Sequence, residues 1–172
     1  MTILDQGVFT ISIDVEFAWG MIDTPMTCKD YAAVTAERDV VSRLLELFKK
    51  YDVRATWAIV GHLMLEHVAK RAVVMPGAPP PEDFAIADDL FDQVSEACRD
   101  VWCVPDVVAM IRDAIPPQEI GSHSFSHVRY DDLRTRREVI EADIAQFVRI
   151  HRKWRLPFAS FIFPYNCAGY LG

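Results

Sequence analysis

Apolar and polar residues alternate along the first part of the chain. Over residues 8–13, the side chains of Phe9, Ile11 and Ile13 fall on one face of an extended backbone and polar residues fall on the other. This period of two residues predicts a β-strand. Three later segments are also predicted as strands: residues 53–60, 119–122 and 158–163.

Apolar residues recur at intervals of three and four between these strands. The clearest helical pattern spans residues 132–154, where Ile140, Ile144, Phe147 and Val148 fall on one face and charged residues lie elsewhere. Further helical patterns cover residues 35–50, 63–74, 83–100 and 105–115, and a proline-rich surface loop is predicted over residues 75–83.

Strands that alternate with helices predict parallel pairing through right-handed crossovers, which is the α/β class. Only four strands can be counted in 172 residues, whereas a closed barrel of eight strands and eight helices takes about 250. We therefore predict a partial barrel of parallel strands in a single domain over residues 1–172. Because no helix follows the fourth predicted strand, we expect the chain to stop before the barrel is complete.

The composition of the chain limits the kinds of partner that it can bind and indicates its cellular compartment. The net charge is -7, and the acidic residues are scattered, so the chain lacks the basic face that nucleic acids require. The N-terminus carries no basic segment before an apolar run, and no apolar run is long enough to span a bilayer. The four cysteines form no C-x-x-C pair. We therefore expect a cytoplasmic protein without a membrane span or disulfides.

Two carboxylates end the first predicted strand. Asp14 and Glu16 are two residues apart, so on a strand they project to the same side, roughly 6.5 to 7 Å apart. One could bind a cation while the other, held off the metal, acts as a base. A pair of solvated acids is the commoner meaning of this short pattern.

Two histidines follow the third predicted strand in the heptapeptide GSHSFSH, residues 121–127. On a helix, His123 and His127 would share one face, whereas on a strand they would lie about 13 Å apart. The glycine and serines favour a turn that folds both imidazoles toward one point. Imidazole binds zinc, nickel or cobalt well. One capping and one exposed histidine remain an equal alternative for this spacing alone.

A proline ends the fourth predicted strand in the sequence Phe163-Pro164-Tyr165-Asn166. Proline fixes its own φ and lacks an N–H group, so the chain turns there. The backbone N–H of Tyr165 could then point into a site and stabilise an oxyanion. A proline that merely ends a strand is the simpler interpretation of this segment.

Taken in order, four segments resemble the polysaccharide deacetylase family, also called the NodB homology domain or carbohydrate esterase family 4. They are SIDVE at 12–16, ATWAIVGHL at 55–63, GSHSFSH at 121–127 and FIFPYN at 161–166. The resemblance implies the N-terminal portion of a distorted (β/α) barrel and metal-dependent hydrolysis of N-acetyl groups on amino sugars. The details of these segments are similar to members linked to surface polysaccharide or lipopolysaccharide synthesis.

The resemblance also implies residue roles. Asp14 matches the family's catalytic base, His123 and His127 match its metal-binding histidines, and Tyr165 matches the backbone donor of its oxyanion hole. The implied cofactor is a divalent metal, zinc first and cobalt or nickel otherwise, and the implied partner is an N-acetylated sugar or polysaccharide precursor.

Two positions depart from the family pattern. The family commonly has adjacent aspartates, but Val15 follows Asp14 here, so Glu16 is the nearest carboxylate to complete the metal site. The arginine that usually stands two residues before the proline is Ile162. The general acid that protonates the leaving amine lies in a later motif of the family, and neither His62 nor His67 is a good substitute.

Two alternative functions stay open. The departures at Val15 and Ile162 are compatible with another C–N hydrolase of the same fold that acts on small amides. The short chain is compatible with an inactive or carbohydrate-binding fragment. An uncovered fourth strand would also expose a sheet edge, which predicts self-association through the incomplete sheet.

Overall fold

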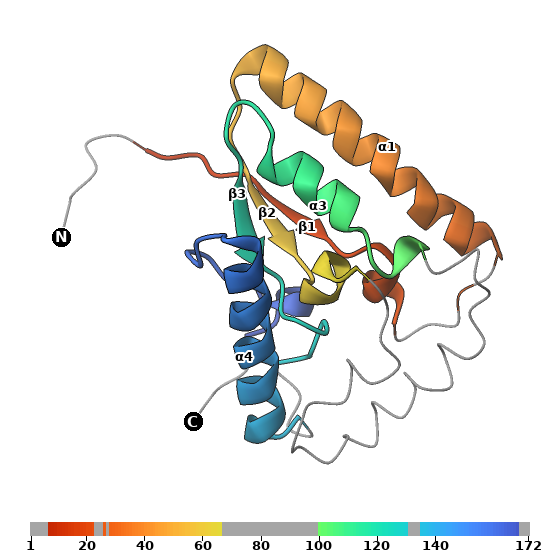
Figure 1. Ribbon diagram of the computed structural model, residues 1–172, viewed down its shortest axis with the longest axis vertical. Helices are drawn as coiled ribbons and strands as arrows, with labels where there is room; N and C mark the ends of the chain where they lie inside the picture. The colour runs from red at the N-terminus through yellow and green to blue at the C-terminus, as the bar shows by residue number, and fades with distance from the viewer. Residues whose placement is uncertain (1–6, 23–25, 27, 67–99, 131–134, 169–172) are drawn as a thin grey trace.

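The computed structural model describes residues 7–22, 26, 28–66, 100–130 and 135–168. A parallel sheet of three strands lies at its centre in the order β1-β2-β3, with β1 at Ser12–Val15, β2 at Thr56–Ile59 and β3 at Glu119–Ser122 (Figure 1). The register aligns Asp14 with Ala58 and Ala58 with Gly121. Neighbouring strands are therefore consecutive in the chain, and all three end at the same edge of the sheet. The predicted α/β class with parallel strands is confirmed.

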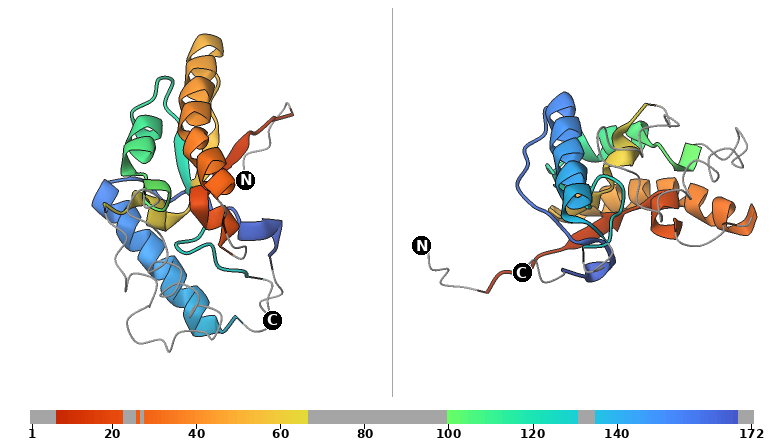
Figure 2. Two further views of the ribbon diagram at one scale, coloured as in Figure 1. Left: turned by 90° about the vertical axis from the view of Figure 1, so that its right-hand side faces the viewer. Right: turned by 90° about the horizontal axis from the view of Figure 1, so that it is seen from below.

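Within the described residues, three α-helices lie around this sheet: α1 at Cys28–Tyr51, α3 at Pro105–Arg112 and α4 at Arg137–Trp154. Figure 1 shows α1 and α3 side by side, while α4 lies apart from them. The views of Figure 2 show the same separation between α4 and α1. A 3-10 turn at Gly61–Met64 follows β2 and contacts both α3 and α4. None of the helices in the described part of the chain has the length and apolar character needed to cross a bilayer.

Large aromatic side chains fill the space between sheet and helices. Trp57 on β2 is fully buried, as are Trp102 and Phe147. Trp19, in the 3-10 turn Phe17–Met21 that follows β1, is also fully buried, and its Nε1–H donates to the backbone oxygen of Trp102 over 2.9 Å. The segments before and after α1 and α3 are thus fixed to one core.

The strand predicted over residues 8–13 forms later in the chain. β1 begins at Ser12, while Val8 and Phe9 are 65% and 88% exposed. Alternation predicts a strand only where a neighbouring backbone is present to pair with it. β2 is that neighbour, and its residues pair with 12–15. The backbone N–H of Thr56 also donates to the oxygen of Ile11, which marks where pairing starts.

The fourth predicted strand, residues 158–163, is reduced to a single parallel bridge between Ser122 and Phe161. Two backbone bonds hold it there, from the Ser122 N–H to Ser160 and from the Ile162 N–H to Ser122. The segment still runs beside β3, so its end reaches the same edge of the sheet as the other strands. The helical patterns predicted over residues 63–74 and 83–100, and the loop over 75–83, fall wholly or largely outside the described residues.

The predicted apolar face of the helix over residues 132–154 needs correction. Ile144 is 37% exposed, whereas Asp143, one residue earlier, is fully buried together with Ile140 and Phe147. The buried stripe therefore contains an acid instead of an isoleucine. Its carboxylate accepts hydrogen bonds from a neighbouring loop, which stabilises an acid where an apolar side chain was expected.

Candidate metal centre

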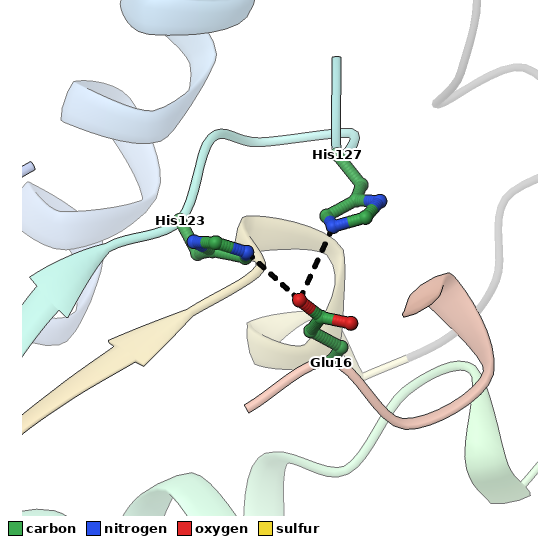
Figure 3. Close-up of side chains that lie close together, drawn as sticks. All are labelled: Glu16, His123 and His127. Atoms are coloured by element: carbon green, nitrogen blue, oxygen red, sulfur yellow. Dashed lines mark hydrogen bonds and ion pairs between the residues drawn. The ribbon is translucent and has the colours of Figure 1, made fainter. Parts of the chain in front are cut away.

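The ends of β1 and β3 bring one acid and two histidines together. Glu16 directly follows β1, and His123 directly follows β3. Because the two strands are parallel and belong to one sheet, their carboxyl ends meet at the same edge. His127 is brought to the same point by the loop that begins at His123 (Figure 3).

The three side chains converge on one oxygen atom. The Nε2 atoms of His123 and His127 lie 2.9 Å and 3.3 Å from Oε1 of Glu16 (Figure 3). One ligand atom from each of the three residues lies within 4.8 Å of the others. Two atoms bound to one tetrahedral zinc at about 2.0 to 2.1 Å are themselves roughly 3.4 Å apart. The separations therefore suit three ligands of one small cation.

The hydrogen bonds of His123 also favour a cation at this point. Its Nδ1 lies 3.1 Å from the backbone oxygen of Ile162, and only a protonated nitrogen can bond to a carbonyl oxygen. A neutral imidazole then presents a lone pair at Nε2, directly toward a carboxylate oxygen of Glu16. Two facing lone pairs repel unless a proton or a metal ion lies between them. The backbone of Ile162 thus orients His123 as metal-ligating histidines are usually oriented.

The loop between the histidines is neither helix nor strand. Ser124 and His127 have positive φ values of 65° and 55°, which L-residues other than glycine rarely adopt. Every residue of the heptapeptide is buried. The backbone N–H groups of Gly61 and His62 donate to the oxygens of Ser124 and Phe125, tying the loop to the turn after β2. The sequence left helix, strand and turn open for this segment and favoured a turn. A turn is what the structure shows.

Asp143 was not recognised from the sequence as part of this region. Its two carboxylate oxygens accept the backbone N–H groups of Phe125 and Ser126, each over 2.8 Å. The hydroxyl of Tyr130 donates to the same carboxylate over 3.2 Å. The signal available in the sequence was an acid at position 143, between Ile140 and Phe147 on the helix face that carries the apolar stripe.

Asp14 lies beside the cluster without joining it. Its Oδ2 is 4.0 Å from Nε2 of His123, and its side chain is 36% exposed. Asp14 and Glu16 both line an open groove of about 380 Å³ between β1 and α1, together with Glu37 and apolar residues. Burial raises the pKa of Glu37, and the nearby charge of Glu16 raises it further. Asp14 is therefore an accessible carboxylate next to the three converging side chains.

Tyr165 lies against the second histidine. Its ring centroid is 4.6 Å from that of His127, and the guanidinium of Arg129 lies 4.5 Å above the tyrosine ring. Pro164 begins a 3-10 turn over Pro164–Asn166, and Tyr165 within it has a φ of 58°. The predicted turn at the proline is present, and the ring of the residue that follows this proline packs against the histidine cluster.

The remaining described histidines are not placed for acid catalysis. His62 is buried with Nε2 3.1 Å from the hydroxyl of Ser126, and burial lowers its pKa to about 3, so its ring is neutral. His151 is buried at the far end of α4, where burial lowers its pKa and Nδ1 lies 3.1 Å from the oxygen of Pro157. His67 lies outside the described residues.

Without a metal ion, N–H groups of the two histidine rings donate to Glu16, and these hydrogen bonds are the main reason that the pKa of its carboxyl is about 2, well below the ordinary value of 4.5. We therefore expect Glu16→Gln to lower the stability of metal-free protein at pH 7 by roughly 1 to 3 kcal/mol. Because the folded-state pKa is depressed, this stabilisation is complete above about pH 4.5 and is lost as the pH falls toward 2.

Urea unfolding in the presence of a chelator, at pH 7 and at about pH 3, measures this difference. Glu141→Gln is the matched control, since Glu141 is exposed on α4 and its ion pair is with the equally exposed Arg137. A stability difference between wild type and Glu16→Gln that is the same at both pH values would contradict the expectation.

The fold of this chain is similar to the folds of solved protein structures. The crystal structure of wild-type BA3943, a CE4 family pseudoenzyme from Bacillus anthracis, matches 94% of this chain and 36% of its own, at 20% identity and a TM-score of 0.50. A mutant of the same protein matches 92% of this chain and 37% of its own, at 21% identity and a TM-score of 0.49. The chain thus spans little more than a third of the length of these solved structures.

The likeness to BA3943 shows a shared fold. No curated protein sequence matches the chain significantly. The family model for polysaccharide deacetylase matches residues 26–165. That match includes β2, β3, both histidines of the cluster and Tyr165, while Asp14 and Glu16 lie before it. The chain belongs to the polysaccharide deacetylase family.

Proposed function

We propose that this chain takes part in metal-dependent removal of an N-acetyl group from an amino sugar, through hydrolysis of a C–N amide bond. The observation that most supports this proposal is the convergence of Glu16, His123 and His127 within a polysaccharide deacetylase domain. The proposed substrate is an N-acetylated sugar of a surface polysaccharide or of its precursor, and the proposed compartment is the cytoplasm. Lipopolysaccharide synthesis is the process in which we would look first.

Glu16, His123 and His127 are the proposed metal ligands. Two imidazole nitrogens and one carboxylate oxygen suit zinc, and cobalt or nickel would accept the same donors. A divalent ion held there would polarise the amide carbonyl and make a bound water more acidic. The bond from His123 Nδ1 to Ile162 keeps the first imidazole in the tautomer that such binding requires.

Asp14 and Tyr165 are the proposed catalytic groups. Asp14 is accessible and adjacent to the cluster, so it can accept the proton of a water that attacks the amide carbon. The carbonyl oxygen becomes negatively charged in this attack. The backbone N–H of Tyr165, the residue whose ring packs against His127, is the proposed donor to that oxygen.

Metal analysis and product analysis of the purified chain test this function together. We expect protein purified without added metal to contain close to one divalent ion per chain, and to release acetate from N-acetylglucosamine oligomers. Absence of a bound ion would refute the metal site. Turnover of small cyclic amides without acetate release would instead support another C–N hydrolase of this fold.

A second candidate function is carbohydrate binding without hydrolysis, which is favoured because neither described histidine outside the cluster is placed to act as the general acid. His62 and His151 are both buried, and burial lowers the pKa of each, so neither ring can readily supply a proton to a leaving amine. In that case the chain would bind metal and oligosaccharide but release no acetate. Calorimetric titration with the same oligomers, beside the acetate assay, separates the two functions.

Self-association through the incomplete sheet is the proposed quaternary arrangement. In the described sheet β1 is an edge strand, and the exposed Val8 and Phe9 extend from it. An uncovered edge next to exposed apolar side chains is suited to pair with a second copy. We expect light scattering to give a mass above 19.6 kDa, and Phe9→Asp to shift it toward the monomer. Ile144→Asp, at an exposed apolar position on α4, should leave it unchanged, and a monodisperse wild-type monomer would contradict the proposal.

A further inference from the structure

The carboxylate of Asp143 is bonded to the middle of the loop that joins the two histidines. Phe125 and Ser126 are the second and third of the three residues between His123 and His127, and their N–H groups are the donors. Each carboxylate oxygen accepts a hydrogen bond from one of these two N–H groups, so the carboxylate restrains the loop at two neighbouring residues. Tyr130, beyond the second histidine, donates to the same carboxylate.

The buried position of Asp143 is energetically unfavourable for a carboxylate. Asp143 is fully buried on α4, and in the described part of the chain its carboxylate is bonded by backbone N–H groups and hydroxyls rather than by a basic side chain. A buried carboxylate without a cation is unfavourable unless several hydrogen bonds compensate for lost water. Burial raises its pKa, whereas the bonds from Phe125, Ser126, Ser124 and Tyr130 oppose that rise by stabilising the charged form. An apolar residue would fill the same helix position without this cost.

The loop, for its part, needs an external restraint. The positive φ values of Ser124 and His127 each cost about 1 to 2 kcal/mol in L-residues. Without a restraint, the backbone would relax toward ordinary φ values and turn the histidine side chains away from one another. The amides of Phe125 and Ser126 lie between these two residues, where a restraint controls both conformations together.

We propose that Asp143 is a positioning residue for the metal centre: its carboxylate holds the backbone between His123 and His127 in the strained turn that directs both imidazoles at Glu16. The inference rests on the proposed function, because it assigns Asp143 a role in metal affinity. It goes beyond that function by placing part of the site's organisation on α4, which contributes no ligand.

The test combines metal affinity with hydrogen exchange. In Asp143→Asn the side-chain oxygen can accept only one of the two amides, and the side-chain nitrogen faces the other. We expect zinc affinity, measured by competition with a chromophoric chelator, to fall about 10- to 100-fold. We also expect faster exchange at the Phe125 and Ser126 amides in metal-free protein, with unchanged exchange in β2. Tyr130→Phe keeps both backbone bonds, so its loss of affinity should be smaller than that of Asp143→Asn.

Glu141→Gln, on the exposed side of the same helix, is the matched control and should leave both measurements unchanged. Equal zinc affinity for Asp143→Asn and Glu141→Gln would overturn the inference. If Asp143→Asn does not fold, hydrogen exchange in the wild-type protein tests the inference. Fast exchange at the Phe125 and Ser126 amides would show that their bonds to the Asp143 carboxylate do not persist, and would overturn it. If the wild type binds no zinc, the proposed function and the role in metal affinity both fail, while exchange still reports whether Asp143 restrains the loop.

Discussion

Replacing His123 with alanine should weaken zinc binding by on the order of 100- to 1,000-fold and reduce acetate release to background. Tetrahedral protein sites bind zinc with about 10 to 16 kcal/mol, so one of four ligands accounts for roughly 3 to 4 kcal/mol. His123 is buried and already oriented by its bond to Ile162, so the alanine variant loses a ligand that needs no reorganisation to bind. His127→Ala should weaken zinc binding and acetate release to a similar extent, because Nε2 of His127 faces the same oxygen of Glu16.

Metal content after dialysis, zinc competition and acetate release measure these losses. His151→Asn is the matched control, since it removes a buried imidazole that lies outside the cluster and whose bond to Pro157 an asparagine amide can replace. It should keep its zinc even if its stability falls. Equal zinc content in wild type, His123→Ala and His127→Ala would show that the convergence of these side chains does not reflect a metal site.

The meeting of acids and histidines was predictable because it depends on topology. Asp14, Glu16 and His123 stand at or just beyond the ends of predicted parallel strands, and such ends share one edge of a sheet. The bounds of the strand over residues 119–122 were also predicted correctly. What topology does not specify is the conformation between His123 and His127. That conformation depends on contacts with Gly61, His62 and Asp143, which are distant in the sequence.

Patterns of polarity failed where a partner element decides the outcome. Residues 9–13 alternate strictly between apolar and polar, but pairing with β2 as a strand begins only at residue 12. Asp143 falls on the apolar stripe of its helix, but an acid gives no indication of burial until the loop amides that it binds are known. Ile144 reads as a core residue by the same rule and is partly exposed. In each case the missing information is a contact between segments that are far apart in sequence.

Replacing Asp14 with asparagine should lower acetate release by roughly 10²- to 10⁴-fold, the usual contribution of a general base. An amide cannot accept the proton of the attacking water, but it has nearly the size and shape of the carboxylate. Asp14 is partly exposed and stands 4.0 Å from the nearest histidine nitrogen. Stability and zinc affinity should therefore change little, and the loss should appear in kcat rather than in metal content.

The comparison of Asp14→Asn with Glu16→Gln tests how the two acids divide their roles around Val15. If Glu16 is the ligand, Glu16→Gln should lose zinc and activity together, whereas Asp14→Asn should lose activity alone. The reverse pattern would make Asp14 the ligand and Glu16 the base. The geometry favours the first assignment, because Oε1 of Glu16 lies 2.9 Å and 3.3 Å from the two histidine nitrogens. With a valine between the two acids, the longer side chain of Glu16 is the one that reaches both histidines, from the residue just after the strand, and it is therefore the proposed ligand.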